Sequence, residues 1–250
     1  MIHPTATIET GAAIAEGVTI GPYCHVSSEA TLEKGVILEP HVHIEGPVSI
    51  GKETHIFAFV HIGNGNASVS IGDRCYIREF THIATEEHET GSVTIADSCY
   101  IMAYVYIHTD VMIEEGCTLT NNVILGKGCR CQSKVIVGAK ATVAAGCTIG
   151  TGSMIGGVSA VTYDIPPYCL IEGYPHATIR GLNLVGMRRR FEDRKSISQV
   201  KKVFMVLKKS AFDPKVAHTL LSEIEDPHAK IFTEFVSQYK INIQRPDPVH

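Results

Sequence analysis

The sequence predicts a parallel β-helix followed by a C-terminal helical domain. An aliphatic residue recurs at every sixth position over Ile8–Ile62, and the same register resumes over Ile71–Ile83 and Ile95–Val161. Only Cys131 among these register positions is not Ile, Leu or Val. A period of six fits neither a helix nor an ordinary strand, and it is typical of a hexapeptide solenoid in which one buried side chain returns on each flat face of a coil.

The hexads also predict the size and core of the solenoid. Three hexads close one triangular coil of 18 residues, so the 25 register positions imply about eight coils. The position two residues before each aliphatic is small or β-branched, and six of the eight cysteines occupy it: Cys24, Cys75, Cys99, Cys117, Cys129 and Cys147. We therefore expect the cysteines to be small buried hydrophobic residues, with no disulfide or metal role.

Two polar segments interrupt the register, Asn64–Ser68 and Thr85–Ser92. A regular β-helix accepts insertions only at its corners, so both are expected to be loops extruded from the coil. Such loops often carry binding function because the scaffold behind them is rigid. A tolerated surface insertion is the alternative for each.

The repeat ends near Tyr163–Tyr168, which contains two prolines. We divide the chain into a β-helix over residues 1–168, a connector over 169–182 and a helical domain over 183–250. Ser196 and Gln199 form a capping-box pattern that predicts the start of one helix. A second is expected over Asp213–Ile224, with Asp at the N-cap and Pro at N1, and a third from about His228 through Val236.

Composition excludes several classes of protein. The 250 residues are 44% hydrophobic and 19% charged, which indicates a large buried core and argues against disorder. A net charge of −4 gives no support for a nucleic-acid partner. No run of 18 apolar residues predicts a transmembrane segment, and Met1–Pro4 lack the features of a signal peptide, so we expect a cytoplasmic protein.

Several segments resemble the UDP-N-acetylglucosamine O-acyltransferases of lipid A biosynthesis, which are hexapeptide-repeat acyltransferases. The resemblance implies a left-handed β-helix and a homotrimer with clefts between adjacent copies. It also implies that an acyl group passes from acyl carrier protein to a nucleotide sugar without a cofactor. The segments that carry the resemblance are Ile77–Glu79, Met102–Val105, Asn121–Asn122, Asp164–Tyr168, Glu172–Ala177 and Gly181–Asn183.

The histidines of that family are not matched here. Ungapped alignment of Met102–Val105 places Thr109 at the position of the family's catalytic base and Tyr106 at that of a second histidine. Two further histidine positions fall on Gly128 and Ala144, whereas Asp110 matches. The family mechanism therefore does not transfer intact.

Threonine cannot replace imidazole as a general base, because its hydroxyl does not ionise near neutral pH. We take His108 and Asp110 as the candidate catalytic residues and Tyr106 as a substrate contact. In register, His108 follows a buried aliphatic and should face outward. An outward corner histidine without a role is the alternative.

The resemblance also implies a substrate-binding set in the C-terminal region. Asn183 matches a substrate contact, and Arg189 and Arg190 match a basic pair that binds phosphate. Arginine suits phosphate because its planar fork donates two parallel hydrogen bonds. A solvated basic turn is the alternative for this pair.

Three functions remain open at this point. The first is an acyltransferase of the lipid A type with an altered base and an altered substrate. The second is a sugar N-acyltransferase that uses an acyl-CoA, since an amine acceptor needs a weaker base. The third is a non-catalytic paralogue that binds a nucleotide sugar or acyl carrier protein.

Four histidines form a separate pattern. His25, His43 and His61 are each 18 residues apart, and His82 joins them if three residues are looped out after Ile62. Residues one coil apart lie about 4.8 Å from each other, so the rings should stack in a ladder on one outer face. Such rings can pack on one another or share a divalent metal. The sequence shows no obvious carboxylate partner, so we assign no metal ligand and expect plain stacking, with a metal as the alternative.

Overall fold

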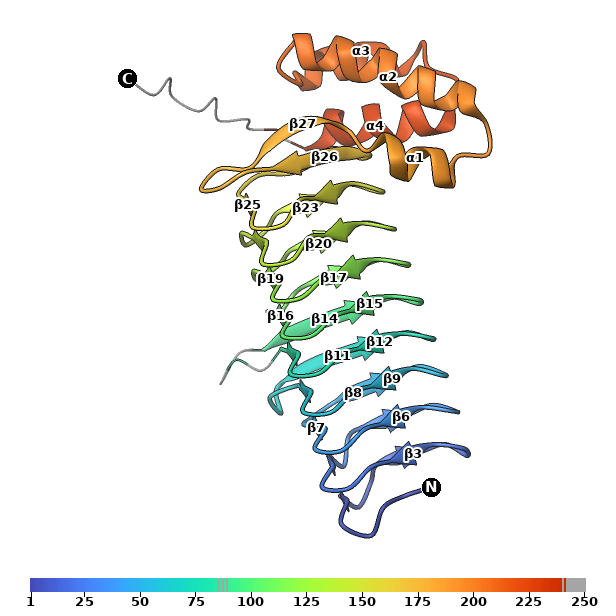
Figure 1. The fold of residues 1–250 in the computed structure, drawn as a ribbon, viewed down its shortest axis with the longest axis vertical. Coiled ribbons are helices and arrows are strands. Elements are labelled where there is room, and N and C mark those ends of the chain that lie inside the picture. Colours follow the sequence, from blue (N-terminus) through green and yellow to red (C-terminus); the bar gives the residue numbers. More distant parts are fainter. Residues whose placement is uncertain (85, 87, 89, 240, 242–250) are drawn as a thin grey trace.

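The computed structural model describes residues 1–84, 86, 88, 90–239 and 241. These residues form a parallel β-solenoid with four helices at its C-terminal end (Figure 1). Most strands are only two residues long, because each flat face of a coil holds one buried aliphatic residue and the residue before it.

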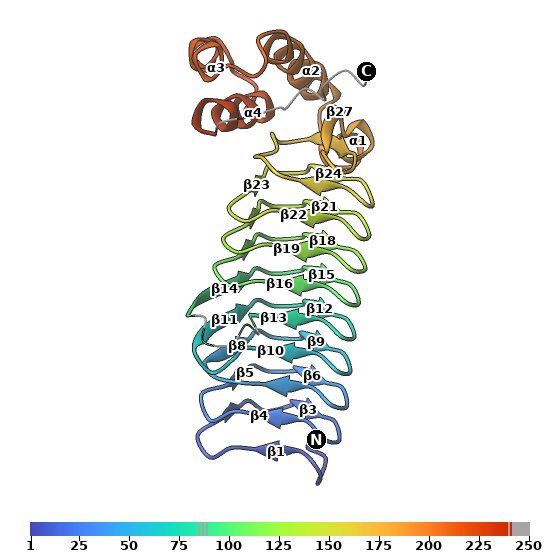
Figure 2. The same ribbon diagram turned by 90° about the vertical axis from the view of Figure 1, so that its left-hand side faces the viewer.

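Three sheets form the faces of the solenoid, and corner segments join them. The first face, seen in Figure 2, comprises β1 (Thr7–Ile8), β4 (His25–Val26), β7 (His43–Ile44), β10 (His61–Ile62), β13 (His82–Ile83), β16 (Tyr106–Ile107), β19 (Ile124–Leu125), β22 (Thr142–Val143) and β25 (Ala160–Val161). The second face comprises β2 (Ala13–Ile14), β5 (Thr31–Leu32), β8 (Val48–Ile50), β11 (Ala67–Ile71), β14 (Gly91–Ile95), β17 (Met112–Ile113), β20 (Arg130–Cys131) and β23 (Thr148–Ile149).

The third face is the longest of the described sheets. It comprises β3 (Thr19–Ile20), β6 (Ile37–Leu38), β9 (His55–Ile56), β12 (Tyr76–Ile77), β15 (Tyr100–Ile101), β18 (Thr118–Leu119), β21 (Ile136–Val137), β24 (Met154–Ile155), β26 (Cys169–Glu172) and β27 (Thr178–Leu182). All pairs are parallel except β26 with β27, which is antiparallel. Residues 169–182 thus add two strands beyond the hexad repeat.

The hexad register forms the core. Ile62, Ile83 and Ile107 are consecutive register partners on the first face, and all three side chains are buried. Each such side chain contributes about 1.5–3 kcal/mol when it leaves water. The first face contains nine strands, so the solenoid has about nine turns, close to the eight that the register positions imply. All eight cysteines are free and buried, as expected of small core residues.

The two insertions leave the coil at the same corner, the one between the first and second faces. The loop expected over residues 64–68 is shorter, because Ala67 and Ser68 belong to β11. Likewise Gly91 and Ser92 belong to β14 and not to a loop. Pairing explains the difference, since β11 and β14 are hydrogen-bonded over five residues each. Residues 85, 87 and 89 of the second insertion lie outside the described residues.

The predicted histidine ladder is confirmed. His25, His43, His61 and His82 are successive register partners on the first face. The rings of His25 and His43 stack with centroids 4.7 Å apart, whereas His43 and His61 meet edge to face at the same separation. Tyr106 continues the row one coil further on.

A second column of rings, not expected from the sequence, lines the corner between the third and first faces. Neighbouring rings are parallel, with centroids 4.8–5.1 Å apart. Each residue has a φ of 58–62°, a left-handed conformation that is rare for bulky side chains. Offset stacking of one ring on the next favours that repeated corner geometry. The column contains Tyr23, His41, Phe59, Phe80 and Tyr104.

Four helices follow the solenoid: α1 (Leu184–Arg190), α2 (Arg194–Lys209), α3 (Pro214–Leu221) and α4 (Pro227–Gln238). The expected cap at Asp213 with Pro at N1 is present. The capping box at Ser196 is wrong, because Asp193 caps α2 and Ser196 lies buried in its first turn. Asp193 precedes Ser196 and its carboxylate accepts from the Lys195 N–H, so the helix begins earlier.

The helices pack on one another through their apolar stripes. Phe204 of α2 contacts Phe232 of α4 edge to face, with centroids 6.1 Å apart, and both rings are buried. In Figure 1 this small bundle covers the C-terminal end of the solenoid beside β26 and β27. Within the described part of the chain, no helix has both the length and the apolarity needed to cross a bilayer.

The register makes a direct prediction about the core. Val143→Asp should prevent folding, because an unpaired carboxylate would replace a fully buried side chain at a cost on the order of several kcal/mol. Thr142→Asp is the matched control, since its exposed side chain precedes Val143 in the same strand. Circular dichroism and solubility measure both variants. A soluble, folded Val143→Asp protein would contradict the assigned register.

Candidate functional site

Tyr106, His108, Thr109 and Asp110 lie on one coil, at the end of β16 and in the corner that follows it. The rings of Tyr106 and His108 are 4.9 Å apart and meet nearly edge to face. The Thr109 side chain is buried, and its carbonyl oxygen accepts from the Gly128 N–H of the next coil at 3.1 Å. Thr109 is therefore part of the coil interior, whereas His108 is the group that faces outward.

His108 contacts a carboxylate that sequence reasoning missed. Its Nδ1 lies 2.5 Å from Oε1 of Glu86, and the two side chains are 36% and 17% exposed. Both carboxylate oxygens of Glu86 are buried and neither has a hydrogen-bond partner among the described residues, so the contact with His108 is an ion pair. Glu86 belongs to the insertion that leaves the same corner one coil earlier, and so the coil spacing brings it to His108.

Asp110 has different partners. Its Oδ1 accepts from the Ser92 N–H at 3.2 Å, and its Oδ2 lies 3.9 Å from Lys127 Nζ. The residue has a φ of 61°, as in the tight corners elsewhere in the solenoid. These contacts tie Asp110 to the start of β14 and to the next coil.

The basic pair predicted from the C-terminal region lies at a separate cavity of about 590 Å³. This cavity is bounded by the third face and by α1. Its wall is partly apolar, and Glu172, Asn183, Arg189 and Arg190 contribute polar groups. The apolar lining residues are Ile136, Met154, Leu170, Leu182, Leu184 and Val185.

Arg190 is the unusual member of the pair. Arg189 is exposed, whereas Nη1 of Arg190 is buried and has no hydrogen-bond partner among the described residues. Burial lowers the pKa of Arg190. A Cβ on Gly152 would lie 3.2 Å from this Nη1, so glycine there leaves room for the guanidinium. A buried cation without a partner is suited to bind an anion.

Asn183 positions the helix that carries both arginines. Its side-chain oxygen accepts from the Gly186 N–H at 3.0 Å and caps α1, and its Nδ2 donates to the Gly152 carbonyl oxygen at 3.1 Å. The side chain is buried. The oxygen and the nitrogen of the Asn183 amide thus both make hydrogen bonds within the protein, although Asn183 also lines the cavity.

Within one chain the two groups of residues do not meet. His108 and Glu86 lie at the corner between the first and second faces, whereas the cavity of Arg190 opens on the third face and α1.

Two family models match separate parts of this chain. Residues 92–127 match a family model described as bacterial transferase hexapeptide (six repeats). Residues 164–244 match a second one, described as UDP N-acetylglucosamine O-acyltransferase, domain 2. The first match includes His108, and the second includes the part of the cavity wall from Leu170 to Arg190.

Relatives match along nearly the whole chain. An acyl-[acyl-carrier-protein]–UDP-N-acetylglucosamine O-acyltransferase of Aliarcobacter butzleri is 39% identical over 253 residues, which cover 97% of each chain. Among solved structures, a UDP-N-acetylglucosamine acyltransferase from Campylobacter jejuni is 31% identical, with a TM-score of 0.81 over 97% of this chain and 98% of that one. LpxA from Acinetobacter baumannii is 28% identical, with a TM-score of 0.88 over 98% and 99%. The predicted fold, a left-handed parallel β-helix with C-terminal helices, is confirmed.

The two bonds of Asn183 can be tested through stability. Asn183→Ala removes the cap of α1 and a bond to Gly152, so the free energy of unfolding should fall by about 1–3 kcal/mol. Asn183→Ser keeps an N-cap acceptor and should lose less. Urea denaturation measures both. If Asn183→Ala were as stable as the unchanged protein, the positioning role would be wrong.

Proposed function

Because this chain belongs to the UDP-N-acetylglucosamine O-acyltransferase family, we propose that it transfers an acyl group from acyl carrier protein to a hydroxyl of a nucleotide sugar, with His108 as the general base. The observation that carries the assignment of the base is the contact of 2.5 Å between His108 Nδ1 and Glu86 Oε1.

The contact suits an imidazole base. A carboxylate beside Nδ1 favours the tautomer with the proton on Nδ1, which leaves the lone pair of Nε2 to accept a proton. The same carboxylate stabilises the imidazolium that forms. Thr109 has no basic nitrogen and its side chain is buried, so it cannot fill this role.

In the proposed reaction, His108 first accepts and then returns one proton. The sugar hydroxyl oxygen attacks the thioester carbon while its proton passes to His108 Nε2. The tetrahedral intermediate collapses, the carbon–sulfur bond breaks, and the proton passes from His108 to the leaving thiolate. The products are an ester and the free thiol of the carrier.

The cavity at α1 supplies the other half of the proposed site. In this proposal Arg189 and Arg190 bind the diphosphate of the nucleotide, and the unpartnered Nη1 of Arg190 supports this role. Because the cavity and His108 lie on different faces of one chain, we propose that adjacent copies of a homotrimer build each site. In this arrangement, His108 comes from one copy and the arginines from the next.

Activity measurements test the base. With acyl carrier protein as donor and a panel of nucleotide sugars that includes UDP-N-acetylglucosamine, His108→Ala should lower kcat by ~10²–10⁴-fold, the usual contribution of a general base. Glu86→Gln should lower it less and shift its pH profile. His218→Ala, an exposed histidine on α3, is the matched control.

Other outcomes have clear meanings. Full activity of His108→Ala would show that the assigned base is wrong. Transfer to an amine from acyl-CoA, with none from acyl carrier protein to any hydroxyl, would favour the sugar N-acyltransferase. Tight binding of a nucleotide sugar without turnover would favour the non-catalytic paralogue.

Mixed trimers test whether neighbouring copies share each site. His108→Ala and the Arg189→Ala, Arg190→Ala double variant should each be nearly inactive alone. Equal mixing during assembly should restore about one quarter of full activity, because one arrangement in four joins an intact His108 to intact arginines. Light scattering should give three times 27.2 kDa. Arg188→Ala, on the same helix and exposed, is the control. A stable active monomer, or no recovery on mixing, would contradict the shared site.

A further inference from the structure

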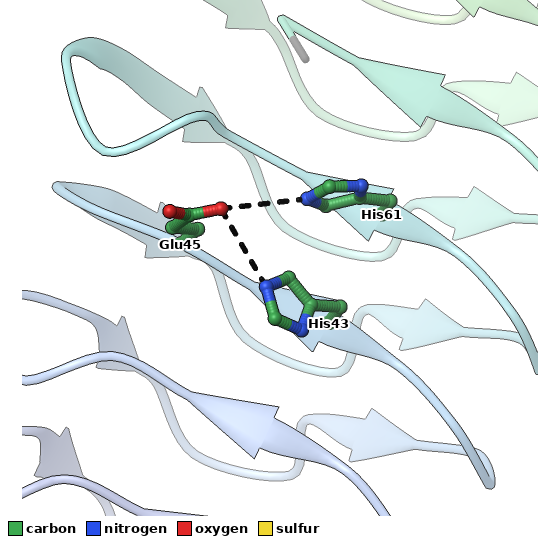
Figure 3. Close-up of side chains that lie close together, drawn as sticks. All are labelled: His43, Glu45 and His61. Atoms are coloured by element: carbon green, nitrogen blue, oxygen red, sulfur yellow. Dashed lines mark ion pairs between the residues drawn. The ribbon is translucent and has the colours of Figure 1, made fainter. Parts of the chain in front are cut away.

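The histidine ladder contains a carboxylate that the sequence pattern did not reveal. Glu45 lies two residues after His43, at the corner that ends β7, and its side chain turns back over the first face (Figure 3). One oxygen, Oε2, lies 3.6 Å from Nε2 of His43 and 3.8 Å from Nε2 of His61. The expectation that no carboxylate accompanies the ladder is therefore wrong.

The three groups converge from different directions. His43 and His61 lie on adjacent strands, β7 and β10, while Glu45 approaches from the corner, as Figure 3 shows. The ring of His61 is turned by 87° from that of His43, unlike the parallel pair of His25 and His43. Edge-to-face rings can direct two nitrogens at one point, which parallel stacked rings cannot.

The distances from Glu45 Oε2 to the two histidine nitrogens are slightly longer than those between ligand atoms around a bound metal ion. Nitrogen and oxygen ligands lie about 2.0–2.2 Å from Zn²⁺, so two ligands of a tetrahedral ion are about 3.3–3.6 Å apart. One ligand atom from each of the three residues lies within 4.8 Å of the other two. Small side-chain rotations close this set around one ion, and the fourth position stays open to water.

The charge state also suits a metal. Nε2 of His61 is buried and has no hydrogen-bond partner among the described residues. Glu45 supplies one negative charge beside this unpartnered nitrogen, and imidazole nitrogens and carboxylates are both ligands of Zn²⁺.

Other acid–histidine contacts of the N-terminal coils lack this convergence. His25 lies 3.5 Å from Glu9, and His55 lies 2.9 Å from Glu39, but each is a single pair. Within the described residues, the one cluster of three potential ligands is that of His43, Glu45 and His61.

We propose that His43, Glu45 and His61 bind one divalent transition-metal ion, with Zn²⁺ as the best fit. Two imidazoles and one carboxylate favour Zn²⁺, Co²⁺ or Ni²⁺ over Mg²⁺ and Ca²⁺, which prefer oxygen ligands. The ion joins two neighbouring coils and is separate from the proposed catalytic corner, because the coil of His82 lies between His61 and the coil that carries Tyr106 and His108. The inference does not depend on the proposed function.

The cysteines do not compete for the ion. All eight are buried in the solenoid. Burial raises the pKa of the Cys129 thiol to about 11 and that of Cys147 to about 12, so both stay protonated at neutral pH. A thiol must lose its proton to bind a metal.

Calorimetric titration of the full, untagged chain with ZnCl₂ tests the site. The unchanged protein should bind one Zn²⁺ per chain, and the melting temperature should rise with Zn²⁺. His43→Ala, His61→Ala and Glu45→Gln should each weaken binding by at least about tenfold. Co²⁺ bound in its place should give the visible absorption of a tetrahedral site, which Glu45→Gln should lose.

His82→Ala is the matched control, because it removes an imidazole of the same row that has no ion pair with a carboxylate among the described residues. It should keep the affinity for Zn²⁺. Glu45→Gln is nearly the same size and partly exposed, so its fold should persist, which circular dichroism checks. No binding by the unchanged protein would overturn the proposal. Equal binding by the His43→Ala, His61→Ala double variant, or an equal loss in His82→Ala, would also overturn it.

Discussion

The structure depends on one repeated contact, the stacking of an aliphatic side chain on its partner one coil away. Ile62, Ile83 and Ile107 show it on the first face, and the same contact recurs on the other two. Because the contact fixes the register of every coil, it also determines which outward residues lie one above another. The histidine ladder, the aromatic corner column and the approach of Glu86 to His108 all result from a spacing that the buried residues impose.

Much of the fold follows from the sequence because the repeat is local and one-dimensional. The aliphatic positions, the buried cysteines and the place of His82 in the ladder all agree with the hexad pattern. The structure differs from the prediction where strand pairing overrides a local loop signal, or where a second residue can cap a helix. Ala67 and Ser68 are polar or small enough to suggest a loop, yet pairing with β14 makes them strand. Asp193 caps α2 ahead of Ser196, because either residue can supply the acceptor.

The sequence predicts where several site residues lie in the fold, but it does not predict which side chains contact them. Sequence places His108 on an outer corner, and the structure agrees. The helix α1 that carries Arg190 was not expected, because the first helix predicted after the solenoid starts at Ser196. Glu45 and Glu86 were missed because their contacts depend on side chains that reach across coils. Glu86 lies in an insertion, where the hexad register gives no information. Asp110 has the expected place, but Ser92 and Lys127 occupy its carboxylate.

The number of coils between the corner of His108 and the helix of Arg190 sets the distance between these two groups along the solenoid axis. Adding or removing one coil there would leave every aliphatic contact intact, so folding alone does not constrain their number. It would, however, move one half of the proposed site along the axis by about 4.8 Å, more than the length of a hydrogen bond. Under the proposed function, the length of this part of the chain is set by the dimensions of the bound molecule, and only the repeat unit is set by the core.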